Sequence, residues 1–175
     1  MKIWYALVFG AFLLPGCGLG EDVDGMASRI ERNEQSLRPL LVSEELDETG
    51  QDLVAELLRD YARYANAHHG DSLAGVFLMR RADLLQGMGE HEAAVEQWVN
   101  VAEGAGSPFL AAEAVFRVGF VRETALKDTV GALKAYGEVV RVYPESRWAS
   151  AAIEAAKWLS FSEREMVRAL ESASD

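Results

Sequence analysis

The sequence predicts an all-α fold, an α-solenoid in which antiparallel helix hairpins stack on one another. Apolar residues recur at the spacing of helical turns along most of the chain after residue 25, and no stretch of useful length alternates apolar and polar residues as a strand does. In addition, Ala94 and Trp98 recur as Ala132 and Tyr136, each after an interval of 38 residues. A repeat of this length built from two helices is typical of a helical array. A four-helix bundle is the alternative all-α fold, but it does not predict the repeat.

The composition indicates a globular protein with an acidic balance. The chain has 175 residues, enough for one ordinary domain, of which 50% are hydrophobic and 26% charged. Its formal net charge is −11. A protein that binds nucleic acid needs a basic face, so this charge argues against a nucleic-acid partner. It argues equally against adsorption on anionic lipid through a polybasic patch.

Residues 1–16 have the features of a lipoprotein signal peptide. Lys2 precedes an apolar run, residues 3–14, that is too short to cross a bilayer. The run ends in Leu14-Pro15-Gly16-Cys17, which resembles the lipobox of bacterial lipoproteins, although its Pro departs from the usual small residue. The resemblance implies cleavage before Cys17, the only cysteine of the chain, and acylation of that residue. An ordinary cleaved signal with an incidental cysteine is the alternative.

The segments that follow lead into the repeat domain. Residues 17–25 are rich in Gly and acidic residues, which favours a flexible tether after the acylated Cys. Residues 26–50 read as a short amphipathic helix, ending before Pro39, and a loop. The repeat domain, residues 51–175, begins with a helix whose wide apolar stripe predicts burial along one side. The stripe consists of Leu53, Leu57, Tyr61 and Tyr64. Gly70 suits the left-handed conformation that ends a helix.

Two helix hairpins are expected in the centre of this domain. Their helices are predicted at residues 73–86, 90–103, 109–125 and 129–143. Gly-containing breaks at 87–89 and 104–108, and Lys127-Asp128, separate them. Another apolar helix is expected at 148–160. A short C-terminal capping helix follows at 162–170, where Ser162 and Glu165 form an S-x-x-E capping box.

Small and aromatic residues occupy matching positions in the two hairpins. They are Ala82, Gly89, Ala94 and Trp98 in the first hairpin, and Ala132, Tyr136 and Pro144 in the second. This pattern resembles the tetratricopeptide repeat (TPR), in which a small residue lies in the first helix, Gly precedes the second helix, and Ala, an aromatic residue and Pro follow. The second hairpin departs from it. Gly119 stands one position off, Phe120 takes the small-residue place, and Lys127 takes the Gly place. The period of 38 residues exceeds the usual ~34, because the loop at 103–107 is extended.

The end of the second hairpin, Tyr143-Pro144-Glu145-Ser146, looks like the repeat ends of TPR proteins of the bacterial envelope, such as those associated with the Tol-Pal system and with outer-membrane β-barrel assembly. The resemblance implies a non-enzymatic scaffold or adaptor lipoprotein that binds envelope proteins. It implies a lipid anchor in the outer membrane and a domain in the periplasm, since Gly18 is not the Asp associated with inner-membrane retention. A scaffold subunit of a secretion or pilus-assembly apparatus is the alternative, followed by a small-molecule binder or an enzyme.

The resemblance also implies a concave partner groove, lined by the first helix of each hairpin. The residues that would face it are Met79, Asp83, Gln86, Arg117, Val121 and Thr124, with Arg80 beside them. The two arginines would meet an acidic group of the partner protein. The alternative is that all of these are ordinary solvent-facing residues.

Patterns for catalysis and metal binding are incomplete in this sequence. His91-Glu92 begins the zinc-protease pattern H-E-x-x-H, but Val95 stands where the second His is required. His68 and His69 are adjacent, so on a helix their side chains diverge and cannot easily share a metal ion. No phosphate-binding loop and no nucleophile elbow occurs. We therefore expect no catalytic residues, no metal and no cofactor.

Overall fold

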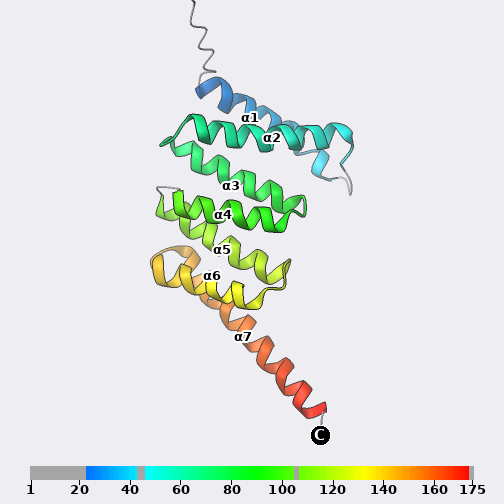
Figure 1. The fold of residues 1–175 in the computed structure, drawn as a ribbon, viewed down its shortest axis with the longest axis vertical. Coiled ribbons are helices and arrows are strands. Elements are labelled where there is room, and N and C mark those ends of the chain that lie inside the picture. Colours follow the sequence, from blue (N-terminus) through cyan, green and yellow to red (C-terminus); the bar gives the residue numbers. More distant parts are fainter. Residues whose placement is uncertain (1–22, 43–45, 105–106, 174–175) are drawn as a thin grey trace, which may run out of the picture.

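The computed structural model describes residues 23–42, 46–104 and 107–173. These residues form seven α-helices, one short 3₁₀ helix and no strand, so the predicted all-α class is confirmed (Figure 1). The elements in chain order are α1 (Val23–Leu37), η1 (Leu40–Val42), α2 (Glu48–Ala67), α3 (Ser72–Gly87), α4 (His91–Gly104), α5 (Pro108–Thr124), α6 (Thr129–Val142) and α7 (Arg147–Ala173). The predicted signal peptide and Cys17 lie outside the described residues. The predicted tether extended to Gly25, whereas α1 already begins at Val23.

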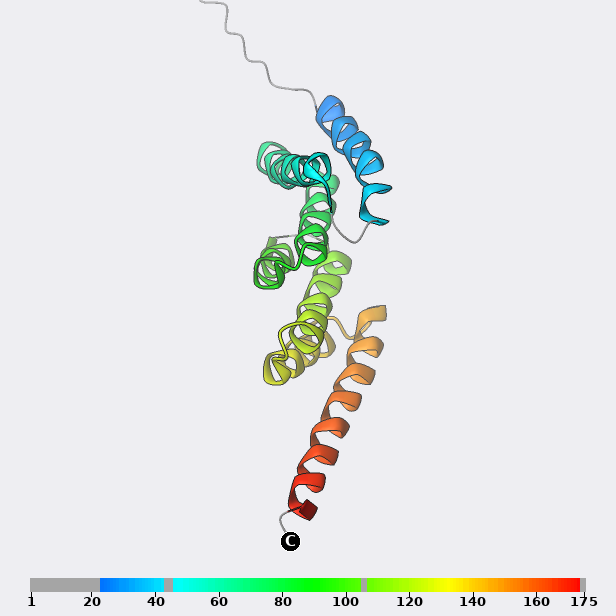
Figure 2. The same ribbon diagram turned by 90° about the vertical axis from the view of Figure 1, so that its right-hand side faces the viewer.

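The helices form a stack in chain order. Each helix packs mainly against the helix before it and the helix after it, and α5 also contacts α3 and α7. Figure 2 shows the consequence: the odd-numbered helices line one side of the stack and the even-numbered helices line the other. Because contacts are between neighbours, the arrangement has the quasi-one-dimensional packing of a repeat structure.

Two apolar clusters fill the stack and meet at α3. The first joins α1, α2 and α3 through side chains such as Ile30, Tyr64 and Phe77, which are fully buried. The second extends from α3 to α7 and contains Trp98 and Tyr136. Leu78 packs against both clusters. The helix that we expected as a separate N-terminal element therefore shares a core with the start of the repeat domain.

The turns between helices repeat with the sequence interval. Gly70 and Gly89 both adopt a positive φ, of +90° and +82°, which glycine tolerates because it has no Cβ. Lys127 follows Gly89 by 38 residues and has a φ of 55°. The second hairpin thus makes the same left-handed turn with a residue that is strained there. Asp128 then caps α6 by accepting a hydrogen bond from the Gly131 amide at 2.9 Å.

The matched alanines and aromatic residues are all in the core, whereas Gly89 and the proline are exposed. Ala82, Ala94 and Ala132 have no exposed surface, and Trp98 and Tyr136 expose 1% each; Pro144 is exposed just after α6 ends. In the second hairpin the close contact is made by Gly119. A Cβ on this residue would lie 2.6 Å from Cε1 of Tyr136, far inside van der Waals contact. Phe120, at the position that the 38-residue interval selects, is exposed instead.

The predicted short capping helix at 162–170 is wrong. The residues from Arg147 to Ala173 form one continuous helix, α7, and Ser162 lies within it instead of starting a new helix. No Gly or Pro occurs between these bounds, so nothing in the sequence interrupts the backbone hydrogen bonds. An S-x-x-E pattern marks a helix start only where the preceding residues cannot continue the helix. Figure 1 shows the C-terminal part of α7 extending past α6, beyond the rest of the stack.

Candidate functional site

A cavity of about 440 Å³ opens between the first three helices. It is lined by Glu34, Leu37, Arg38, Leu41, Leu57, Tyr61, Arg80, Asp83, Leu84, Gly87 and Met88. It therefore includes two of the predicted groove residues, Arg80 and Asp83. Its lining combines charged side chains with apolar ones, as binding sites for peptides commonly do.

A hydrogen-bonded group of three side chains forms one wall of the cavity. Glu34 of α1 accepts a hydrogen bond from the Tyr61 hydroxyl at 2.8 Å, and its two carboxylate oxygens accept from Nη1 of Arg80 at 2.9 and 3.0 Å. The Arg80 guanidinium also lies 5.5 Å from the centre of the Phe77 ring. Burial, together with the Glu34 carboxylate, raises the pKa of Tyr61 well above its usual range. Tyr61 therefore stays neutral, and its hydroxyl donates a hydrogen bond to the Glu34 carboxylate.

These positions follow from the amphipathic pattern of α1. Met26, Ile30 and Leu37 pack into the first cluster, and they fix the side of α1 that faces α2. Glu34 lies one helical turn after Ile30 on the same side of α1, so its carboxylate lies at the edge of the core. There it meets Tyr61, whose ring is buried but whose hydroxyl needs a partner.

A second charged group connects α3 to α5. Nη1 of Arg117 lies 3.0 Å from Oδ1 of Asp83, and Nη2 of the same guanidinium lies 2.8 Å from Oε1 of Glu113. Burial raises the pKa of the Asp83 carboxyl, Arg117 lowers it, and Glu113 raises it again. The Trp98 side chain also favours the charged carboxylate, although the indole nitrogen does not reach hydrogen-bond geometry. The net shift of the Asp83 pKa is upward.

The rim of the cavity is apolar and open. Leu41, on η1, exposes 52% of its surface, and Met88, which follows α3, exposes 40%; both line the cavity. Leu37 and Leu57 are buried behind them. This geometry can accept an apolar side chain between Leu41 and Met88, with the half-exposed Asp83 carboxylate available to a donor beside it.

The structure separates the predicted groove residues into three groups. Met79 and Val121 are in the second core, exposing 5% and 1%, so the prediction that they face an open groove is wrong. Both follow the apolar spacing of their helices, which turns them toward the neighbouring helix. Arg80, Asp83 and Arg117 do lie at the surface of the odd-numbered helices, but each is already paired within the chain.

The remaining two predicted residues lie outside the cavity. Gln86 is half-buried near the end of α3, and Thr124 is exposed at the end of α5, where its hydroxyl donates to the Phe120 carbonyl at 2.7 Å. Neither residue lines the opening.

Sequence reasoning missed the residues that α1, η1 and α2 supply to the site. Glu34 and Leu41 lie in a segment that we expected to precede the repeat domain, and Tyr61 was assigned to an apolar stripe without a polar role. A usable signal was present for Tyr61, because a buried tyrosine usually finds a hydrogen-bond partner. Nothing in the sequence alone places Glu34 next to Arg80, 46 residues away.

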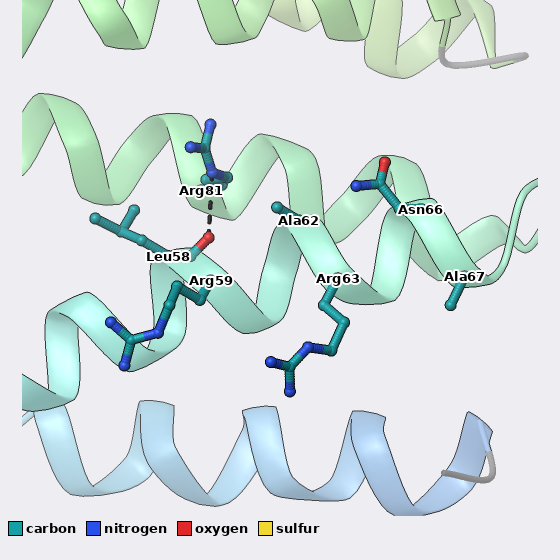
Figure 3. Close-up of a pocket in the computed structure, with 7 residues that line it drawn as sticks. All are labelled: Leu58, Arg59, Ala62, Arg63, Asn66, Ala67 and Arg81. Carbon is teal, nitrogen blue, oxygen red and sulfur yellow. Dashed lines mark hydrogen bonds between the residues drawn. The ribbon is translucent and has the colours of Figure 1, made fainter. Parts of the chain in front are cut away.

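A second cavity, of about 740 Å³, lies on the outer surface of α2 and carries three arginines (Figure 3). Arg59 and Arg63 turn toward α1, whereas Arg81 comes from α3 and points away from them. The Nε atom of Arg81 donates to the Leu58 carbonyl at 3.2 Å, and its Nη1 atom donates to Gln97. Because the guanidinium groups do not converge, this cavity is not a built site for an anion.

The histidines do not form a metal site in the part of the chain that the structure describes. There, no group of three or more His, Cys, Asp or Glu side chains could hold a metal ion. His69 contacts the carbonyl oxygen of Ala65 at 3.0 Å, and the His68 ring packs against Tyr64 with a centroid separation of 4.6 Å. Among the described residues, no helix is long and apolar enough to cross a membrane.

Comparison with known proteins gives no assignment. No protein-family model, no curated protein and no solved structure matches this chain.

Proposed function

We propose that this protein is a TPR-type binding scaffold, a lipoprotein that holds partner proteins in a bacterial envelope complex. The proposal rests on one observation: turns and buried residues of the structure recur at the same interval as the sequence repeat. The left-handed turn at Gly89 recurs at Lys127, and the buried aromatic Trp98 recurs as Tyr136, each after 38 residues. Stacked hairpins of this kind present extended surfaces that bind peptides and helices of other proteins.

The cavity between α1, α2 and α3 is the part of this surface that best fits a protein ligand. It is open, it has apolar side chains at its rim, and its charged residues are ordered by hydrogen bonds before any partner binds. Ordered side chains reduce the entropy that binding must overcome. We expect the partner to insert an apolar side chain between Leu41 and Met88 and to place a basic group near Asp83.

The binding site can be tested with two exposed rim residues. Leu41→Asp and Met88→Asp each put a charge at the opening without removing a buried side chain, so the fold should persist. Crosslinking in native membranes, followed by pull-down of the full chain, should recover partner proteins with the wild type. With either variant, the amount of partner recovered should be at least about tenfold lower.

Val130→Asp is the matched control. Val130 exposes 78% of its surface on α6, away from the cavity, so this variant should recover the same partners as the wild type. Recovery of the wild-type protein alone, with no crosslinked partner, would contradict the scaffold proposal. If Leu41→Asp, Met88→Asp and the wild type all recover the same amount of partner protein, the binding site lies elsewhere on the stack.

The membrane anchor is proposed from Cys17, and it has an independent test. Labelling with a fatty-acid analogue should mark the wild-type chain and leave Cys17→Ala unlabelled, since the thiol that would be acylated is removed. We place the anchor in the outer membrane and the helical domain in the periplasm. Equal labelling of both chains, or no labelling of either, would contradict the lipoprotein assignment without affecting the binding surface.

A further inference from the structure

A cavity of about 560 Å³ lies between the last two helices of the stack, α6 and α7. The two helices pack along each other in opposite directions, because only residues 143–146 connect them. The lining residues extend from Leu133 to Arg141 along α6 and from Ile153 to Arg164 along α7. At 1.5 Å per residue these two spans are about 12 and 16 Å long. The cavity is therefore a groove that follows the hairpin for about two to three helical turns.

Apolar side chains of both helices line this α6–α7 groove. Ile153 exposes 41% of its surface, and Leu133 and Val140 on α6 are half-buried. Gly137 lies between Leu133 and Val140 in the sequence, it lines the groove too, and a Cβ on it would meet no atom within 4 Å. The groove therefore offers apolar contacts and leaves room for another segment to approach.

The charged residues of the groove all have the same sign. Among the described residues that line it, three are cations and none is acidic; the cations are Arg141, Lys157 and Arg164, and all three are exposed. The chain as a whole has 28 acidic residues against 17 Lys and Arg. The groove is thus locally positive in a protein whose net charge is negative.

Most of this positive charge has no partner in the part of the chain that the structure describes. There, Arg141 and Arg164 make no ion pair, whereas Lys157 lies 2.8 Å from Glu154. The side chains of that pair are 66% and 63% exposed, so a carboxylate of a ligand can replace Glu154 at little cost. In the cavity between α1, α2 and α3, by contrast, the charged side chains bind one another. The α6–α7 groove is therefore complementary to an anionic ligand.

We propose that the α6–α7 groove binds an acidic amphipathic helix of a partner protein. The apolar side chains of that helix lie along the apolar lining, and its carboxylates lie beside the three cations. A helix fits because a groove between two antiparallel helices accepts a third helix along its length. The inference does not rest on the lipid anchor or on the cavity between α1, α2 and α3. It adds a site of opposite preference, since the first cavity offers Asp83 to a basic group.

The shape of the groove favours a protein over an anionic membrane. A flat bilayer surface contacts the outer sides of two neighbouring helices, whereas a single helix fills the groove between them. The net charge of −11 also opposes the approach of the whole molecule to anionic lipid.

Two synthetic peptides test the charge preference of the full chain. Each has about 16 residues with leucines at i, i+4, i+7 and i+11, and they differ only in carrying either glutamates or lysines beside the leucines. Fluorescence anisotropy in a non-ionic detergent, with detergent alone as the blank, should give the Glu peptide a dissociation constant on the order of 10 µM. The Lys peptide should bind at least about tenfold more weakly. Equal binding of the two peptides, or binding of neither, contradicts the proposal.

Reversal of the groove charges tests where the peptide binds. Arg141→Glu/Lys157→Glu should weaken binding of the Glu peptide at least about tenfold. It should also bind the Lys peptide within about threefold of the affinity of the wild type for the Glu peptide. Arg32→Glu/Arg59→Glu makes the same change in net charge at exposed positions of α1 and α2, and it should leave both affinities unchanged. Equal effects of the two double variants, or no gain of Lys-peptide binding, would show that the groove does not select the ligand.

Gly137→Leu tests the groove without changing any charge. The new side chain occupies the open space beside Gly137, so the Glu peptide should bind at least about tenfold more weakly while helical circular dichroism is retained. Unchanged binding would place the peptide outside the groove. Leu41→Asp, in the first cavity, should not affect this peptide, which separates the two sites.

A lipid competition distinguishes a partner helix from a membrane. Phosphatidylglycerol added to the detergent micelles should displace the Glu peptide no more than phosphatidylcholine does. Preferential displacement by the anionic lipid would assign the three cations to a membrane surface and overturn the proposal.

Discussion

The two central hairpins, α3–α4 and α5–α6, make the same turn from different residues. Gly89 adopts the left-handed conformation in the first, and Lys127 adopts it in the second, where its Nζ atom donates to the Thr124 carbonyl at 2.7 Å. The turn is therefore imposed by the packing of the helices on either side, since lysine gains nothing from a positive φ of its own. Tertiary contacts here override local preference.

The hairpins also differ in how closely their helices meet. In the first, Ala82 and Trp98 are both buried; in the second, the corresponding pair is Gly119 and Tyr136, with Gly119 one residue out of step. Tyr136 has a hydrogen-bond partner, because its hydroxyl donates to Glu123 at 2.6 Å, whereas the indole nitrogen of Trp98 has none within the described residues. The repeat thus conserves the shape of the contact while its polar chemistry changes.

Removing either aromatic should have the largest effect. Trp98→Ala and Tyr136→Ala each empty a site with 1% exposure, so each should lower the free energy of unfolding by about 4 kcal/mol. Tyr136→Phe should cost only about 1 kcal/mol, the contribution of its hydrogen bond to Glu123. Urea denaturation followed by circular dichroism measures all three. A Tyr136→Phe variant as unstable as Tyr136→Ala would show that the second hairpin depends on its polar contact more than on shape.

Substitutions of glycine should have the next largest effect on stability, and this effect should depend on how closely the glycine is packed. Gly119→Ala places a methyl group within 3 Å of the Tyr136 ring, so we expect a loss of about 2 kcal/mol despite the better helix propensity of alanine. Gly137→Ala is the matched control, because a Cβ there meets no atom within 4 Å, and it should gain up to about 1 kcal/mol. If both variants shift the urea midpoint in the same direction, the close contact at Gly119 does not limit packing.

Exchanging the turn residues should give opposite effects of smaller size. Lys127→Gly removes the strain of a positive φ and should stabilise the protein by about 1 kcal/mol. Gly89→Lys introduces that strain in the first hairpin and should destabilise it by a similar ~1 kcal/mol. Thermal unfolding of the two variants will show the shifts. Shifts of the same sign would mean that the two turns are not equivalent.

The ion pair between Asp83 of α3 and Arg117 of α5 should make the stability of the protein depend on pH. Burial raises the pKa of Asp83, which contacts Arg117 across α3 and α5, so the folded protein binds this proton more readily than the unfolded chain does. The contribution of Asp83 to stability should therefore decrease as pH rises above about 4, through its raised pKa.

The comparison that isolates this group uses Asp83→Asn, which cannot titrate. The free energy of unfolding of the wild type, relative to that of the variant, should decline as the pH rises above about 4. Other carboxylates cancel in the difference. A difference that rises with pH would show that Arg117 outweighs burial at this site.

The sequence was a good guide to the helices and a poor guide to the site. Helical periodicity and turn residues located every helix from α1 to α6, because amphipathic spacing and glycine conformations are local properties. The prediction is wrong at the end of α7, because a capping pattern does not start a new helix where no residue breaks the preceding one. The cavity was found in part. Arg80 and Asp83 were named, but Glu34 and Leu41 reach it through the packing of α1 on α2, which a pattern within one segment does not encode.

The neighbour-to-neighbour packing of the helices determines how the molecule would respond to tension. A pull between the two ends of the stack passes through every helix interface in series, so the weakest interface would yield first while the others keep their contacts. At the N-terminal end, Arg29 binds Asp60 of α2 and Glu34 binds Arg80 of α3. A load applied to α1 is therefore shared between two helices before it reaches the cavity that they enclose.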